Sequence, residues 1–124
     1  MYPNSSTRSA YGTATVRSER ASEYAVFAQV TSRLKAVDET DKSAFPALAH
    51  AVTENQRLWA TLAEDLMSDA NLLPLDLRAR LISLSEFVRR HSLAVLGGRD
   101  TVAALIDINT AIMKGLRGDL EHAA

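Results

Sequence analysis

Residues 74–98 read PLDLRARLISLSEFVRRHSLAVLGG, and this stretch decides the class of fold. Leucine and valine recur in it at intervals of three and four residues, the spacing of one face of an α-helix. Pro74 suits the first turn of a helix, and the pair Gly97-Gly98 suits a C-terminal cap. The stretch therefore predicts a helix over residues 74–96, about 35 Å long at 1.5 Å per residue.

The rest of the chain continues this pattern. No glycine occurs between Thr13 and Leu96, whereas a sandwich or barrel needs turn residues at short intervals. Periodicity and cap residues predict three more helices, over residues 18–37, 43–67 and 100–118. Short connections between long helices favour antiparallel neighbours, so we expect an all-α, single-domain bundle of four main helices, with room for a short additional N-terminal helix.

Individual residues mark the expected helix ends. Ser18 is the expected N-cap of the first helix, Asp41 or Ser43 that of the second, and Asp100 that of the fourth. Pro46 is compatible only with a first turn, which places the start of the second helix close to residue 43.

The two ends of the chain are expected to lie outside the bundle. Residues 1–16 are rich in serine and threonine, and we expect a segment that is flexible or is ordered by a partner. The helical domain then covers residues 17–118, and a short tail covers residues 119–124.

The expected core consists of the residues that share the apolar face of each helix. They are Tyr24, Phe27, Thr31 and Leu34, then Phe45, Leu48, Val52, Trp59, Leu62 and Leu66, then Leu77, Leu81, Leu84, Val88 and Val95, and finally Val102, Leu105, Ile106, Ile112, Met113 and Leu116.

Composition excludes several classes of protein. The 124 residues carry a net charge of −1 from 14 basic and 15 acidic side chains, so no large basic field is available for nucleic acid. The absence of cysteine excludes disulfides, zinc ribbons and thiol nucleophiles. The longest apolar run, residues 44–49, is far too short to span a membrane, and the N-terminus lacks the apolar core of a signal peptide. A cytoplasmic location follows as the expectation.

The residues that could carry catalysis or bind a metal do not converge. His50 and Glu54 are one helical turn apart, but no further ligand accompanies them, so we expect exposed neighbours. His91 is expected at the core edge with a hydrogen bond. The acids near the end of the second helix are expected in solvent: Glu64, Asp65 and Asp69. No nucleophile elbow, phosphate-binding loop or dinucleotide motif occurs, so we expect no enzyme and no cofactor.

Two asparagines fall on apolar helix faces. Asn55 lies between Val52 and Trp59, and Asn109 lies among the apolar residues of the fourth helix. Because a buried amide is costly without partners, we expect an interhelical hydrogen-bonded pair that fixes the register of the bundle. The alternative is that one amide stays available to a partner. The Trp59 indole belongs to the core and needs a hydrogen-bond acceptor.

The third helix has more apolar surface than one core contact requires. Leu75, Ile82 and Leu93 form a second line along it, with Phe87 on the opposite flank. One interpretation is a central helix packed between two neighbours. The other is a groove for a partner's amphipathic helix, with these four side chains as anchors and Arg89 and Arg90 on the rim.

Three segments carry a further signal. Residues 55–59 read NQRLW, residues 73–79 read LPLDLRA, and residues 105–109 read LIDIN and are followed by IMKGL at 112–116. Together they resemble the FlaF family of flagellar biosynthesis regulators of alphaproteobacteria, over roughly residues 9 to 117.

The resemblance implies a non-enzymatic role in flagellum assembly. Proteins of this family promote flagellin synthesis and secretion, bind flagellin as secretion chaperones and work alongside the regulator FlbT. The implied partners are therefore the amphipathic terminal helices of flagellin, FlbT and the flagellar export apparatus. Two alternatives stay open, a post-transcriptional regulator that acts through a protein partner, and a homodimer formed through the third helix. Direct contact with RNA is disfavoured because the arginines of that helix alternate with acids.

Overall fold

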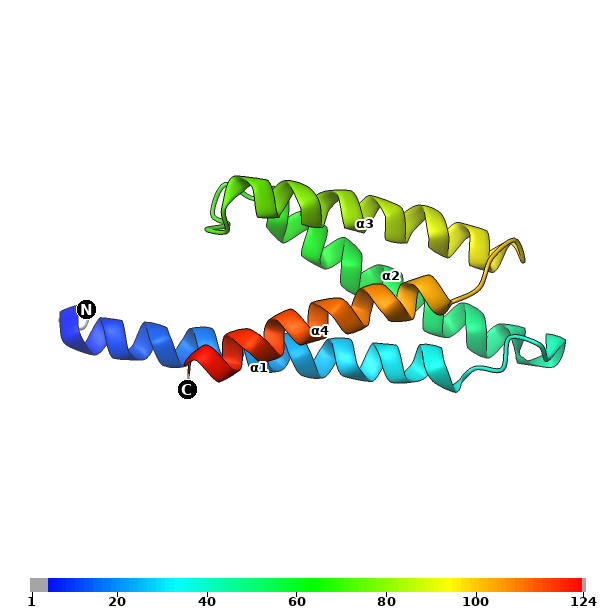
Figure 1. Cartoon of the computed structure of the whole chain (residues 1–124), viewed down its shortest axis with the longest axis horizontal. Helices are drawn as coiled ribbons and strands as arrows, with labels where there is room; N and C mark the ends of the chain where they lie inside the picture. Colours follow the sequence, from blue (N-terminus) through cyan, green and yellow to red (C-terminus); the bar gives the residue numbers. More distant parts are fainter. Residues whose placement is uncertain (1–4, 124) are drawn as a thin grey trace.

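The protein folds as an all-α bundle (Figure 1). The computed structural model describes residues 5–123, with side chains from residue 21 to residue 118. The elements in this range are α1 (Ser5–Ala36), a 3-10 turn η1 (Lys42–Ala44), α2 (Phe45–Met67), α3 (Leu75–Leu96) and α4 (Ala103–Ala123). None of the residues described is in a strand, and the predicted fold class is confirmed.

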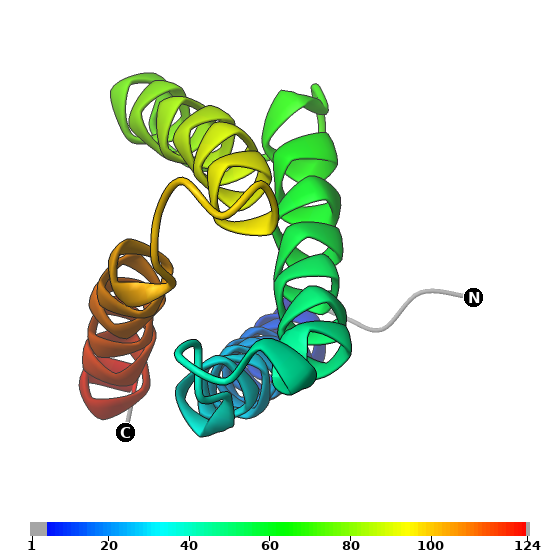
Figure 2. The same cartoon turned by 90° about the vertical axis from the view of Figure 1, so that its right-hand side faces the viewer.

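The helices form two antiparallel pairs. α1 packs mainly along α4, and α2 packs mainly along α3, while α2 also contacts α1 and so joins the pairs. α3 and α4 meet at the turn between them and diverge from there, so they share little contact (Figures 1 and 2). This divergence leaves much of α3 without a neighbour on either side of its contact with α2.

The start of α2 follows the sequence prediction. Asp41 accepts hydrogen bonds from the Ser43 backbone N–H at 2.9 Å and from the Ser43 hydroxyl at 2.7 Å. Pro46 occupies the first turn, where its missing N–H has no intrahelical partner to lose. Asp41 is therefore the residue that caps this end, through the short turn η1.

The end of α3 is also as predicted. Gly98 adopts a left-handed backbone with φ +73°, its N–H donates to Val95 O, and the Arg99 N–H donates to Ala94 O at 2.8 Å. These two bonds form a Schellman motif, in which glycine supplies the one conformation that other residues adopt at a cost.

The predicted start of α1 and the predicted end of α4 are wrong. α1 begins at Ser5 rather than Ser18, so Ser18 lies inside the helix and residues 5–16 are helical; residues 1–4 lie outside the described range. Nothing after Pro3 breaks a helix there, because the single glycine, Gly12, costs only about 1 kcal/mol. α4 likewise runs through Gly115 and Gly118 to Ala123.

The start of α4 also differs from the prediction. Val102 accepts the first intrahelical bond, from Ile106 N, while Asp100 bonds only the neighbouring Thr101 N–H. The free N–H of Val102 is bound by both carboxylate oxygens of Glu39 at 3.2 Å. Glu39, from the connection between α1 and α2, therefore caps α4, although it is 63 residues from Val102 in sequence.

The core fills the junction of the four helices. Its centre is Trp59, and the Phe27 ring meets it edge-on at 5.8 Å. Two expected core residues are exposed instead, Phe45 at 47% and Leu77 at 39%, and each lies in the first turn of its helix. The buried apolar residues are Phe27, Val30, Leu34, Leu48, Ala51, Val52, Trp59, Leu66, Val88, Val95, Val102, Leu105 and Leu116.

Candidate partner-binding surface

A notch of about 180 Å³ lies between α2 and α3 and contains two of the predicted binding residues. Leu93 stands at this notch with 54% of its surface exposed, and Arg89 lies beside it. Buried Val52 and Ser92 belong to its lining. An apolar cavity of about 150 Å³ is large enough for benzene, so the notch can accept one apolar side chain. Its lining residues are Val52, Thr53, Gln56, Arg89, Ser92, Leu93 and Leu96.

Leu75 and Ile82 continue the line of Leu93 along α3, at intervals of seven and eleven residues. Leu75 is 78% exposed and Ile82 is half-buried, and neither lines the notch. We call these three side chains the Leu93 flank. They form a discontinuous apolar stripe, with the notch at its C-terminal end.

Phe87 does not belong to this stripe. It is 40% exposed and lies about 120° around the helix from Leu75 and Leu93. A separate shallow hollow of about 470 Å³ surrounds it, lined only by α3 residues: Ala79, Arg80, Ser83, Leu84 and Phe87. We call these five residues the Phe87 flank. The predicted set of anchors is thus divided between two surfaces, and no single groove contains them.

The Phe87 ring is held in place by its neighbour. It stacks on the His91 ring at 5.4 Å with an interplanar angle of 21°. His91 Nε2 lies 2.8 Å from Thr101 O, and because a carbonyl only accepts, this nitrogen carries the proton. Its Nδ1 lies 3.7 Å from Asp100 Oδ2. The hydrogen bond predicted for His91 is therefore present, and it anchors Phe87 to the α3–α4 turn.

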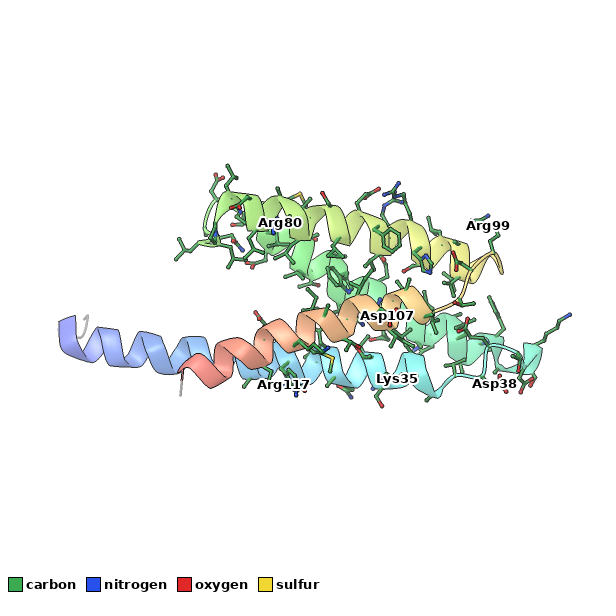
Figure 3. All side chains as sticks on the ribbon, in the orientation of Figure 1. Lys35, Asp38, Arg80, Arg99, Asp107 and Arg117 are labelled. Atoms are coloured by element: carbon green, nitrogen blue, oxygen red, sulfur yellow. The ribbon has the colours of Figure 1, made fainter. Side chains whose placement is uncertain are left out.

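The charged residues differ between the two flanks. Arg89, predicted on the rim, bonds Glu86 at 2.6 Å, and this hydrogen bond, with the guanidinium charge, lowers the pKa of the Glu86 carboxyl. Arg90 is exposed and makes no ion pair with any residue the structure describes. Arg80 (Figure 3) meets Asp76 only at 3.5 Å, with both side chains more than three-quarters exposed.

The asparagine pair forms a buried polar network. Asn109 Nδ2 donates to Asn55 Oδ1 at 2.7 Å, and Trp59 Nε1 donates to Asn109 Oδ1 at 2.9 Å. All three side chains are fully buried. Asn55 Nδ2 has no partner in the described part of the chain, but its burial keeps it from any partner protein. The pair therefore joins α2 to α4 and offers no binding group.

An exposed apolar tip lies outside the residues that the sequence predicts for partner binding. Met67 is 61% exposed and Leu72 is 96% exposed, at the connection from α2 to α3. Arg78 fixes this connection by donating to Leu66 O at 2.9 and 3.0 Å and to Ser68 O at 3.2 Å. The sequence signal for this tip is the pair Leu72-Leu73 at the end of the break over residues 68–73, which reads SDANLL.

The remaining candidates form no site. His50 is exposed, and Glu54 pairs with Arg57 at 3.3 Å. Among the side chains that the structure describes, those of residues 21–118, no three metal-ligating groups gather in one place. The carboxylates near the end of α2 are all exposed: Glu64, Asp65 and Asp69. Across the described residues, none of the helices combines the length and apolarity that crossing a bilayer requires.

Comparison with known families accounts for nearly the whole chain. The model of the family described as flagellar protein FlaF matches residues 7–116, from the first turns of α1 to near the end of α4. The chain belongs to the FlaF family. No curated protein and no solved structure matches it. The family match includes the notch, both flanks of α3 and the Asn55–Asn109 pair.

Proposed function

We propose that this FlaF-family protein is a non-enzymatic, cytoplasmic assembly factor that binds flagellin as a secretion chaperone and promotes its synthesis and export. The observation that carries the proposal is Leu93, an apolar side chain 54% exposed at the edge of an open notch on a well-packed bundle. An exposed apolar side chain beside an open notch gives the apolar face of a partner helix a place to pack. The family match supports a flagellar role for that surface.

The binding mode follows from what unpolymerised flagellin exposes. Its terminal segments form amphipathic helices, and before assembly these lack the neighbours that cover their apolar faces. A helix laid along the Leu93 flank buries its apolar stripe against Leu75, Ile82 and Leu93, the helix-in-groove mode. Arg89 and Arg90 lie at the polar edge of such a complex. Chemistry is not required for this role, because the chaperone only has to bind and release.

Isothermal titration against unpolymerised flagellin tests the proposal. We expect micromolar or tighter binding with a negative heat-capacity change and little dependence on salt, since apolar burial dominates. The double variant Ile82→Asp with Leu93→Asp should abolish binding and keep its helical circular dichroism. Phe45→Asp is the matched control, since Phe45 is also an exposed apolar residue but lies at the start of α2. If the double variant binds flagellin with wild-type affinity, the interface lies elsewhere than on the Leu93 flank.

The apolar tip of Met67 and Leu72 favours a second candidate function, regulation of flagellin expression through a protein partner such as FlbT or a component of the export apparatus. This tip lies away from the notch, at the opposite end of the α2–α3 pair. Titration of FlbT against the wild type and Leu72→Asp distinguishes the candidates. Loss of FlbT binding with intact flagellin binding would assign the tip to the regulator.

A further inference from the structure

The connection from α2 to α3 presents its apolar tip, Met67 and Leu72, on a hydrogen-bonded support. The Asn71 side chain accepts a bond from the Leu73 backbone N–H at 3.0 Å and donates one to Asp65 at 3.1 Å. Both neighbours of Leu72 are thereby held, while Leu72 itself is 96% exposed. A leucine fixed in water adds almost nothing to the core, but it loses little freedom when a partner covers it.

No other part of the described bundle covers this tip. Figures 1 and 2 show the end of the α2–α3 pair that carries it standing apart from α1 and α4. The few contacts between α3 and α4 agree with this separation. The tip is therefore open to a partner from the outside of the molecule.

The surroundings of the tip are acidic. Residues 58–77 contain four acidic side chains and neither lysine nor arginine. All four acids are exposed: Glu64, Asp65, Asp69 and Asp76. The first cations that follow lie on α3, where Arg78 donates to carbonyls at the end of α2 and Arg80 meets Asp76 at 3.5 Å. Negative charge is thus in excess around Met67 and Leu72.

The fold does not account for all of these acids. Glu64 and Asp65 lie in the last turn of α2, where the helix dipole favours cations, and this turn contains no basic residue. Asp65 has a structural role through its bond to Asn71. Glu64 and Asp69 have no ion-pair partner among the residues that the structure describes. Departures from local preference without a structural gain are expected at functional sites.

The charge and the apolar centre of the surface together select its occupant. An acidic surface repels the anionic headgroups of a membrane, and it repels the same tip on a second copy of the chain. It attracts a segment that combines apolar side chains with lysine or arginine.

We propose that the tip binds a basic amphipathic segment of a protein partner. Met67 and Leu72 pack among the apolar side chains of that segment, and Glu64 and Asp69 face its cations. This inference rests on the second candidate function, in which the tip serves a protein partner, and it states the chemistry that this partner presents. The Leu93 flank and its binding of flagellin are separate from it.

Two synthetic peptides test the charge of the partner. Both are amphipathic helices of about 18 residues with leucine along one face, and the other face carries lysine in one peptide and glutamate in the other. The full chain is titrated with each peptide while NMR follows the methyl signals of Met67 and Leu72. We expect the lysine peptide to shift both signals to saturation and to bind at least about tenfold more tightly than the glutamate peptide. Raising the salt from about 50 to about 500 mM should weaken it.

Matched variants assign the contact to the tip. Leu72→Ser should weaken the lysine peptide about fivefold, whereas Phe45→Ser, at an exposed apolar residue at the start of α2, should not weaken it. Glu64→Lys should weaken the lysine peptide about tenfold and strengthen the glutamate peptide. The new lysine suits the C-terminal end of a helix, so the loss cannot come from unfolding. Asp107→Lys, at an exposed acid on α4, is the control and should change neither affinity.

The outcomes separate this inference from the function on which it rests. If FlbT does not bind but the lysine peptide binds at the tip, the assignment of the tip to FlbT is refuted and this inference stands. If FlbT binds through Leu72 and Glu64→Lys leaves that binding unchanged, the regulator function stands and this inference is refuted.

Three further results would overturn the inference. The first is equal binding of the two peptides. The second is a lysine peptide that shifts signals of the Leu93 flank and not those of the tip. The third is a shift of the Met67 and Leu72 signals by phosphatidylglycerol vesicles, or by a higher concentration of the protein alone, since these results would identify a membrane or a second copy as the occupant.

Discussion

The side chains of Asn55 and Asn109 meet in the centre of the bundle, where Asn109 donates a hydrogen bond of 2.7 Å to Asn55 and accepts one of 2.9 Å from Trp59. The three groups connect α2 to α4 although 50 or more residues separate them in sequence. An apolar core would allow helices to slide along one another, whereas a directed pair of bonds has one register. The surface of α3 is thereby supported by a core of defined geometry.

Asn109→Ala should lower the free energy of unfolding by about 3 kcal/mol. The variant leaves the Trp59 N–H and the Asn55 oxygen buried without partners, at about 1–3 kcal/mol for each orphaned group, and it opens a small cavity. Urea unfolding followed by far-UV circular dichroism measures the loss. Asn55→Leu combined with Asn109→Leu is the informative control, because it leaves only Trp59 orphaned. A loss below 1 kcal/mol in Asn109→Ala would mean that the network is not coupled as described.

Gly98→Ala and Gly115→Ala should have opposite effects. Neither added Cβ meets another atom within 4 Å, so packing does not contribute. Gly98 has φ +73°, where alanine costs about 1 kcal/mol, and the variant should be destabilised by that amount. Gly115 lies inside α4, where alanine is favoured by up to about 1 kcal/mol, and the variant should be more stable. The melting temperature of the wild type should lie between those of the two variants. A shift of both melting temperatures in the same direction would contradict the roles given to the two glycines.

The features that the sequence predicts correctly are those with a local cause. Pro46 and Asp41 define the start of α2, and Gly98 defines the end of α3, because each acts within its own turn of the backbone. The asparagine pair is predictable for a different reason. An amide on an apolar face needs a partner, and only two helices offer one.

The predictions that are wrong concern features that depend on neighbouring helices, which the helical pattern of one segment does not reveal. Leu77 and Phe45 have the spacing of core residues, but they lie in the first turns of their helices and are exposed. How much of the α3 surface stays uncovered depends on the divergence of α4 from α3, which side-chain periodicity does not encode. The predicted start of α1 at Ser18 is wrong for a local reason. No residue between Ser5 and Ser18 forces that helix to begin later.

The cap at Asp41 should make stability depend on pH in the acid range. Hydrogen bonds from the Ser43 side chain and backbone hold the pKa of Asp41 below its ordinary value of 3.8. Because the folded pKa is the lower one, this contribution is complete above pH 3.8 and is lost as the pH falls through the folded pKa. Asp41→Asn keeps a capping oxygen but does not titrate.

The wild type should therefore lose stability relative to Asp41→Asn between pH 4 and pH 2.5, and the difference should be constant above pH 5. Urea unfolding of both proteins across this range measures it. The pKa of Asp38 is lowered in the same way by Thr40, but this group is present in both proteins and cancels. A difference that stays constant down to pH 2.5 would show that Asp41 is not bonded as an anion.

Arg78→Ala should destabilise the connection between α2 and α3. The guanidinium donates three hydrogen bonds to carbonyls at the end of α2, two to Leu66 O and one to Ser68 O. Leu66 O has no intrahelical partner, while Ser68 O also accepts from the Asn71 N–H at 3.1 Å, and the cation opposes the negative end of the helix dipole. We expect a loss of about 2 kcal/mol in urea unfolding, with faster amide exchange over residues 68–73. Arg78→Lys keeps the charge but not the planar fork, so it should recover less than half of the loss. Full recovery by lysine would show that the charge, and not the hydrogen-bond geometry, holds the tip with Leu72 in place.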